Sequence, residues 1–297
     1  MGEPLGSIVA SAGLPSVPSG AVLSVVLVAS VLHALWNAIA KSMKDQVVAF
    51  GLIALAATVS GGCMLLVVRA PSGASAPFLA GSVAVHLAYN VALLNSYRFG
   101  DLGEVYPLAR GIAPLLVAGG AALVAGERLA PAQLVGIAVV AGGLTSLVWS
   151  RRVRSLRDRH ALWLAVAAGV AIALYSVVDG LGVRRAASPL GYAGALFLAE
   201  GFATLVGISW VRRRDLARGL DRSFVLGLFG GVLSVVAYAL VLFAQTKVAL
   251  ATVSALRETS VVVAALIGTV VLHEGSGRRR VLSALVVAAG VALLVAA

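Results

Sequence analysis

Apolar runs of about 20 residues, the length of a transmembrane helix, recur along this chain. Only 12% of its 297 residues are charged, against roughly 25% in soluble domains. So few charges could not cover a globule of this size with a water-compatible surface. The runs also lack the strict alternation of polar and apolar residues that membrane barrel strands show. We therefore predict an all-α polytopic membrane protein, because helices satisfy their backbone hydrogen bonds internally, as lipid requires.

The hydropathy pattern predicts ten transmembrane helices in two groups of five. A basic connector at 151–160 (RRVRSLRDRH) separates a first five-helix repeat, residues 1–150, from a second five-helix repeat, residues 161–297. The predicted spans lie near residues 21–42, 46–68, 77–99, 104–125, 130–149, 161–183, 189–211, 223–246, 252–272 and 280–297.

The two groups are similar in sequence. When the chain is shifted by 147 residues, Arg110 aligns with Arg257 and Glu127 aligns with Glu274. Each arginine is thus followed by a glutamate 17 residues later, across the same span of its group. Because five is an odd number, the second group starts on the opposite side of the membrane and lies inverted. Inverted repeats are typical of secondary transporters, which bind substrate near the bilayer midplane at the repeat interface.

Four stretches carry a resemblance to a known family. They are LHALWNAIAKS in the first span, VYPLARGIAPLLVA in the fourth, GERL followed by GIAVVAGG, and VSALRETSVVVAALIGTVVLHE in the ninth. From about residue 22 onwards the chain resembles the EamA-type members of the drug/metabolite transporter superfamily. The resemblance implies ten helices in two inverted five-helix repeats, no ATP hydrolysis, and movement of metabolites, amino acids or drugs. It implies export more often than import.

We therefore expect a secondary active transporter, integral to the cytoplasmic membrane, that works by alternating access and exports small organic solutes. The expected partners are a small-molecule solute and membrane lipids, and no cofactor is expected. The net charge of +11 does not indicate nucleic-acid binding, because the arginines lie in short loops between apolar spans. Since two halves are fused in one chain, a monomer could be complete, and a homodimer is the alternative.

The loops differ in positive charge. One side of the membrane receives 16 of the 23 Lys and Arg residues and the other side receives 5. Cytoplasmic loops carry the excess of Lys and Arg, so this bias places both termini outside the cytoplasm. The family is more often drawn with both termini inside.

Arg110 and Arg257 lie inside predicted spans. Each is about six residues into its span, or roughly 9 Å from one face. Intramembrane charges mostly face cavities. We therefore expect the two guanidinium groups to flank a central cavity from its two ends. Each could clamp a substrate carboxylate or phosphate, or pair with an acid as a gate. The alternative is that each snorkels to the interface.

A buried arginine needs a counter-charge. Glu200, near the middle of the seventh span, is the best candidate, and as a buried carboxylate it could also couple transport to protons. The alternative is a static partner for an arginine. Asp179 and Glu258 are expected as further coupling or ion-pair residues, and Glu127 and Glu274 as polar anchors at span ends.

Polar and aromatic residues recur at helical spacing on several spans. Such faces do not point cheaply at lipid, so we expect them to line a solute pathway. The alternative is hydrogen bonding between helices, worth about 0.6 kcal/mol on average. With one histidine per helix and no ligand cluster, no metal site is expected. The residues are His33, Trp36 and Asn37; His86, Tyr89 and Asn90; Tyr175 and Asp179; and Tyr238 with Gln245.

Two further patterns concern helix shape. Pro107 and Pro114 interrupt the fourth run, and proline removes a backbone hydrogen bond, so this helix is predicted to bend. Glycine pairs such as Gly61-Gly62 and Gly142-Gly143 predict close approach of helices.

An intramembrane enzyme is the main rival class, and a lipid flippase would share the transporter architecture. HEGSG at 273–277 begins like the zinc-protease motif HExxH, but its last position is glycine. The chain has neither a Walker A sequence nor a Gly-x-Ser-x-Gly elbow. We therefore expect that the protein is not an enzyme.

Overall fold

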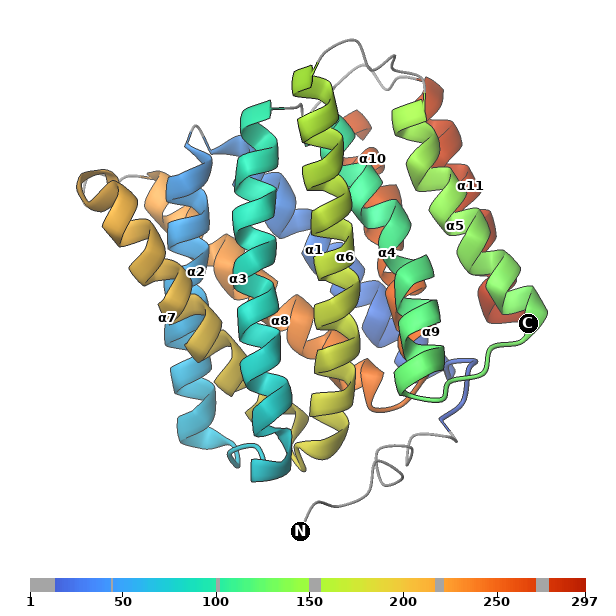
Figure 1. Cartoon of the computed structure of the whole chain (residues 1–297), viewed down its shortest axis with the longest axis horizontal. Helices are drawn as coiled ribbons and strands as arrows, with labels where there is room; N and C mark the ends of the chain where they lie inside the picture. Colours follow the sequence, from blue (N-terminus) through green and yellow to red (C-terminus); the bar gives the residue numbers. More distant parts are fainter. Residues whose placement is uncertain (1–13, 44, 100–101, 150–155, 217–221, 271–277) are drawn as a thin grey trace.

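The computed structural model describes residues 14–43, 45–99, 102–149, 156–216, 222–270 and 278–297. This part of the chain contains helices and no strands (Figure 1). The helices are α1 (Gly20–Ser42), α2 (Gln46–Val67), the 3-10 turn η2 (Gly73–Ser75), α3 (Ala76–Phe99), α4 (Leu102–Val124), α5 (Pro131–Trp149), α6 (Leu156–Arg185), α7 (Pro189–Leu216), α8 (Arg222–Gln245), α9 (Leu250–Arg257), α10 (Thr259–Val270) and α11 (Arg278–Ala296).

Every predicted span coincides with helix, and the all-α polytopic fold is confirmed. Within the described residues, seven helices are long and apolar enough to cross a membrane, and α5 and α11 contain shorter apolar helices. Two details differ from the sequence prediction. Helix α6 begins at Leu156, inside the predicted connector, and the ninth span is divided into α9 and α10.

The packing of helices has the symmetry of an inverted repeat. Helix α2 packs against its counterpart α7, and α5 packs against its counterpart α11. The pair α3 and α6 is matched by α8 and α1, and the pair α4 and α6 is matched by α9–α10 and α1. Helices α1 and α6 run in opposite directions (Figure 1). The fold is therefore two inverted five-helix repeats.

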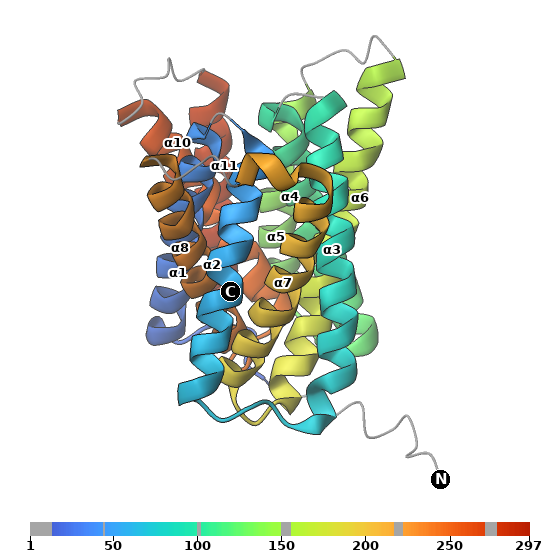
Figure 2. The same cartoon turned by 90° about the vertical axis from the view of Figure 1, so that its left-hand side faces the viewer.

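The repeats are interwoven rather than side by side. Figure 2 shows α1, α2, α8 and α10 on one side of the bundle and α3, α4, α5 and α6 on the other. Each side therefore contains helices from both halves of the sequence.

Glycines allow close packing in the two pairs formed by a helix and its counterpart, α2 with α7 and α5 with α11. A Cβ atom at Gly61 on α2 would lie 2.6 Å from the carbonyl oxygen of Gly194 on α7, and one at Gly136 on α5 would lie 2.9 Å from that of Gly290 on α11. Small residues allow such close approach in membranes. The predicted close approach is confirmed at Gly61 and at Gly143, where a Cβ atom would lie 3.0 Å from Cγ1 of Val286 on α11, whereas Gly142 faces open space.

The two ends of the bundle are packed differently. We call the end where α1 passes into α2 the mouth end, at the top of Figure 1, and the end where α1 begins the closed end. The largest apolar cluster fills the closed end and includes Val26, Val117, Ile137, Leu250 and Leu294, all fully buried. Large apolar side chains also lie on the outside of the bundle, where a soluble protein would be polar and where lipid would cover them.

The break in the ninth span falls at Glu258. This residue forms the C-cap of α9, and α10 begins at Thr259. The hydroxyl of Thr259 donates to the carbonyl oxygen of Leu256 at 2.7 Å, and that of Ser30 contacts the carbonyl oxygens of Leu256 and Arg257 at 3.5 Å. Helix α4 runs as one helix through Pro107 and Pro114, and its predicted bend stays a prediction. The interruption occurs in its counterpart.

Candidate functional site

A cavity of about 150 Å³ lies between the two sides of the bundle. Its walls come from α1, α2, α3, α4, α6, α7, α8 and α9, so both repeats contribute. It extends from Arg257 and Tyr238 in the middle of the bundle to Lys41 and Gln46 at the mouth end. The volume is sufficient for several water molecules or a small organic solute, because one water needs about 10–15 Å³.

The structure brings all ten predicted substrate-binding residues to this one cavity. They are contributed by six of the helices that line it, and each is far in sequence from most of the others. The residues are His33, Trp36, Asn37, His86, Tyr89, Asn90, Arg110, Tyr175, Tyr238 and Arg257.

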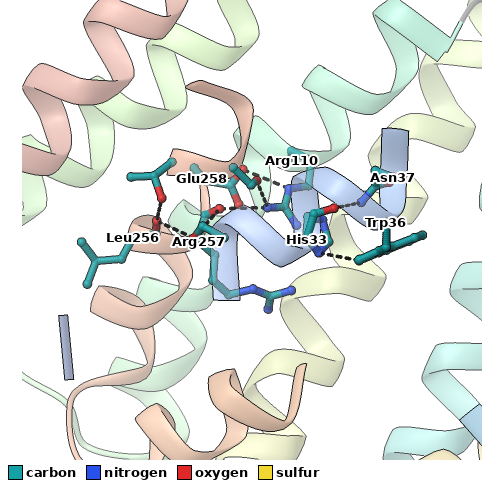
Figure 3. Close-up of polar contacts among 10 residues, drawn as sticks. His33, Trp36, Asn37, Arg110, Leu256, Arg257 and Glu258 are labelled. Atoms are coloured by element: carbon teal, nitrogen blue, oxygen red, sulfur yellow. Dashed lines mark hydrogen bonds and ion pairs between the residues drawn. The ribbon is translucent and has the colours of Figure 1, made fainter. Parts of the chain in front are cut away.

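Arg110 is neutralised by a buried acid. Its Nε atom donates to Oε2 of Glu258 at 3.0 Å, and both side chains are 3% exposed. Its Nη2 atom donates to Oγ of Ser260 at 3.2 Å and to the carbonyl oxygen of Arg257 at 3.4 Å. Figure 3 shows this group of contacts around the break. Arg110 thus neutralises the carboxylate of Glu258 and donates a hydrogen bond to a carbonyl oxygen at the C-terminal end of α9. A positive charge is favourable at this end of a helix.

These contacts correct two expectations. The counter-charge of Arg110 is Glu258 and not Glu200, because the break at Glu258 directs its carboxylate towards α4. The two arginines also do not flank the cavity from opposite ends. Arg110 reaches the backbone of Arg257, so the aligned residues of the two repeats meet at one level.

Arg257 has different surroundings. Its guanidinium carbon lies 5.3 Å from the centroid of the Tyr238 ring, in a cation–π arrangement. The residue is 7% exposed and lines the cavity. Figure 3 shows its guanidinium pointing away from Arg110 and Glu258. Among the described residues, no carboxylate forms an ion pair with it.

Aromatic rings form one wall of the cavity beside Arg257. The rings of His86 and Tyr175 are stacked, with centroids 4.0 Å apart. Tyr238 meets both edge-on, at 5.8 Å from His86 and 6.1 Å from Tyr175. Tyr89 and Phe197 extend the cluster, at 5.8 Å from Tyr175 and 6.2 Å from Tyr238 respectively. This wall is suited to an apolar or aromatic group.

The predicted polar face of α1 forms another wall. Nε1 of Trp36 donates to Nδ1 of His33 at 3.3 Å, and Nδ2 of Asn37 donates to the carbonyl oxygen of His33 at 2.8 Å (Figure 3). The spacing of these residues on one helix turn explains both contacts.

Glu200 also lines the cavity, on α7. Its Oε1 atom accepts a hydrogen bond from Nδ2 of Asn90 at 3.1 Å, and the same nitrogen contacts Oγ1 of Thr204 at 3.4 Å. The side chain is half-buried. A carboxylate is therefore present in the cavity wall, held by a neutral partner.

Asp179 lies behind the cavity wall and is fully buried. Its two oxygens accept hydrogen bonds from the hydroxyls of Tyr192, at 2.9 Å, and Tyr238, at 2.6 Å. Within the described part of the chain it forms no ion pair, so the expected pairing with an arginine is not seen. Gln245 is also outside the cavity lining, and its Nε2 atom contacts the carbonyl oxygen of Ser176 at 3.3 Å.

A second polar group seals the closed end. Glu127 forms an ion pair with Arg184 at 3.0 Å, and its two oxygens accept from the backbone N–H of Leu250 at 3.0 and 2.9 Å. Arg184 also donates to the carbonyl oxygens of Gln245 and Val248, at 2.8 and 3.1 Å. Glu127 thus caps the positive end of α9 and ties the α4–α5 loop to α6. Its sequence counterpart, Glu274, lies outside the described residues.

Several lining residues were not identified from the sequence. Thr204 lies one helix turn after Glu200, and Ser234 lies one turn before Tyr238. The i to i+4 spacing could have identified both. Phe50 and Phe197 carry no such signal, because an apolar residue in an apolar span is typical of lipid contact. Among the described residues, no group of three His, Cys, Asp or Glu side chains could hold a metal ion.

Comparison with known proteins finds a family match in the second half of the chain. The model of the EamA-like transporter family matches residues 159–296. A solved structure, described only as the crystal structure of a protein, superposes with a TM-score of 0.72, covering 93% of this chain and 96% of its own, at 17% sequence identity. At that identity the likeness establishes the fold alone. No curated protein matches the chain. Residues 159–296, the second half of the chain, thus match the EamA-like transporter family, which is part of the drug/metabolite transporter superfamily.

Proposed function

We propose that the protein is a secondary active transporter that exports small organic solutes across the cytoplasmic membrane by alternating access. The observation that carries this proposal is the polar and aromatic cavity between two inverted repeats, which extends to the mouth end and is blocked at the closed end. Inverted repeats with a central site are the architecture in which one repeat rocks against the other.

Two layers of contacts at the closed end would act as a gate that keeps the cavity shut on that side. The apolar cluster that includes Val26, Val117 and Leu250 lies between the cavity and the ion pair of Glu127 with Arg184. To open this end, the helices must separate and both layers of contact must break. Both layers join the two repeats, because α4 belongs to the first and α6 and α9 to the second.

The charge of the loops supports a direction. The connections at the mouth end are those that carry most of the Lys and Arg residues. The positive-inside rule places this end in the cytoplasm. The cavity then faces the cytoplasm, where a solute for export would enter. Helix α1 begins and helix α11 ends at the opposite end (Figure 1), which this orientation places outside.

A carboxylate in the cavity offers a coupling site. Glu200 lines the cavity and accepts a hydrogen bond from the amide of Asn90, and no cation among the described residues forms an ion pair with it. Carboxylates that line a transport pathway form the proton relays of many transporters. We place the proton coupling of transport at Glu200.

The proposal is tested by solute release from proteoliposomes. Vesicles containing the purified protein are loaded with a mixture of small acids, amines and neutral metabolites, and release is followed by mass spectrometry with and without a pH gradient. We expect release of a subset of solutes that empty vesicles retain. The variant Asn37→Trp, which places a large side chain in the cavity wall, should abolish that release. The matched control Leu66→Trp, at a position 86% exposed on the outside of α2, should not.

Two results would contradict the proposal. One is release that Asn37→Trp leaves unchanged, since the cavity would then not be the pathway. The other is movement of a fluorescent phospholipid between leaflets without release of any soluble compound, which would make the protein a lipid flippase.

A further inference from the structure

We propose that the solute is a small organic anion, with its carboxylate on Arg257 and its apolar part against the aromatic wall formed by His86, Tyr175 and Tyr238. This inference rests on the proposed function, because it names the chemical class that the same cavity transports. It assigns the two cavity arginines different roles: Arg257 binds the solute, and Arg110 holds the fold.

The first step concerns charge balance. Arg110 is paired with Glu258 at 3.0 Å and also holds the Ser260 hydroxyl and the Arg257 carbonyl. Its positive charge is matched inside the protein, and Figure 3 shows its guanidinium turned towards the break. A solute anion at Arg110 would have to compete with Glu258, so this arginine is a poor binding group.

The second step concerns the arginine without an ion pair. Arg257 is 93% buried, since 7% of its surface is exposed, and among the described residues no carboxylate pairs with it. Arginine does not lose its proton in proteins. A buried charge without a counter-ion is costly unless one arrives. The ring of Tyr238, 5.3 Å from the guanidinium, offsets this cost in part and leaves the nitrogen atoms free of a carboxylate.

The third step excludes the nearby acids as permanent partners. Both oxygens of Asp179 already accept hydrogen bonds from Tyr192 and Tyr238. Glu200 accepts its hydrogen bond from Asn90 on α3. The counter-charge for Arg257 is therefore missing from the described structure, and the cavity that this side chain lines is the route by which a counter-ion could reach it.

The fourth step concerns the shape of the ligand. A guanidinium group can bind a carboxylate through two parallel hydrogen bonds, and that of Arg257 lies over the Tyr238 ring. The stacked pair of His86 and Tyr175 lies next to Tyr238, so the body of the ligand would meet aromatic faces. A second void of about 10 Å³, also lined by Arg257, has room for about one water molecule. The solute itself must fit the main cavity of about 150 Å³.

The test compares ligands that differ only in charge. Thermal unfolding of the purified protein in detergent is measured with 3-phenylpropionate, 3-phenylpropan-1-ol and 3-phenylpropylamine. We expect the acid to raise the melting temperature at a concentration about tenfold lower than the alcohol, the difference that a charge-assisted contact supplies. The amine should have no effect, because it would bring a second positive charge beside Arg257.

Variants separate binding from folding. Arg257→Gln should remove the preference for the acid over the alcohol, and Arg257→Lys should keep part of it because the charge is retained. Arg69→Gln, at an exposed arginine outside the cavity, is the matched control and should behave like the wild type. The response to the alcohol reports whether each variant still has a folded cavity.

Four results would overturn the inference. They are an equal response to acid and alcohol, a preference for the amine, a preference for the acid that survives in Arg257→Gln, and no stabilisation by the acid at millimolar concentration. None of them decides the proposed function, which is tested separately by solute release and its block in Asn37→Trp. Release of neutral or cationic solutes alone would overturn the anion class and leave the transporter proposal standing.

Discussion

Arg110 on α4 donates from Nε to Oε2 of Glu258, 3.0 Å away and 148 residues later in the chain. The carboxylate stands at the break between α9 and α10, so the pair ties the fourth span of one repeat to the interrupted ninth span of the other. Glu258 directly follows Arg257, which aligns with Arg110 in the sequence. The two arginines are therefore equivalent positions of the two inverted repeats with different contacts. Arg110 holds the break, and Arg257 faces the cavity.

Removing one partner of this pair should destabilise the protein strongly. Glu258→Gln leaves the Arg110 charge buried without compensation, which typically costs about 3–5 kcal/mol. We expect a large fall in the melting temperature, measured in detergent by the loss of monodisperse protein on heating. The double variant Arg110→Met with Glu258→Met should recover part of the loss, since no charge remains. Single and double variants that are all as stable as the wild type would show that the pair does not hold the break.

A matched pair of glycine variants tests the contact between α2 and α7. A Cβ atom at Gly61 would lie 2.5 Å from the backbone nitrogen of Leu198, whereas one at Gly62 meets only the flexible end of the Leu198 side chain at 3.9 Å. Gly61→Ala should therefore cost about 1–3 kcal/mol through overpacking. Gly62→Ala should be neutral or slightly stabilising, because alanine is the better helix former. Equal melting temperatures for the two variants would contradict the tight packing at Gly61.

Glu200→Gln should uncouple transport from the pH gradient. The substitution keeps the shape and the hydrogen-bonding capacity of the side chain but removes its proton-binding group. In proteoliposomes we expect exchange of labelled solute at equal pH to continue while gradient-driven release falls to the level without a gradient. The exchange assay is the internal control for a folded, occupied cavity. Gradient-driven release at the wild-type rate would place the coupling elsewhere.

A reporter fused after Ala297 tests the orientation. The described C-terminus lies at the closed end, which the positive-inside rule places outside the cytoplasm (Figure 1). A fused alkaline phosphatase should therefore be active, and a fused green fluorescent protein should not fluoresce. The opposite pattern would place the mouth end outside and would reverse the proposed direction of loading.

Much of the fold could be predicted from the sequence because a single force, the transfer of apolar side chains to lipid, determines it. All ten spans follow from hydropathy, and the repeat follows from the paired spacing of Arg110 to Glu127 and Arg257 to Glu274. The inversion follows from the odd number of spans in each half. The cavity lining followed from polar residues at helical spacing, because such faces must turn away from lipid.

The details around the arginines could not be predicted. The stretch SALRETSV contains neither glycine nor proline, so nothing local indicates a break at Glu258. The prolines pointed instead to α4, which continues through them. Glu200 looked like the better counter-charge because it stands isolated in mid-span. The pairing of Glu258 depends on how α9 and α4 meet, which is tertiary information.

The contact of Glu127 with Arg184 joins residues 57 positions apart at the closed end. Breaking it should favour the conformation open at that end. In a background with the exposed Cys63 changed to alanine, a cysteine replaces Ala251, which is fully buried in the closed end. A second reporter replaces the cavity residue Ser234 with cysteine. Glu127→Gln is combined with each reporter, and Arg128→Gln, at an exposed neighbour, is the matched control.

The rate at which a membrane-impermeant maleimide labels these two cysteines, added from each side of the membrane, tests alternating access most directly. Alternating access predicts that Glu127→Gln speeds labelling at position 251 from the closed-end side and slows labelling at position 234 from the mouth side, while Arg128→Gln changes neither. Labelling rates at the two positions that rise together, or that do not respond to Glu127→Gln, would contradict it.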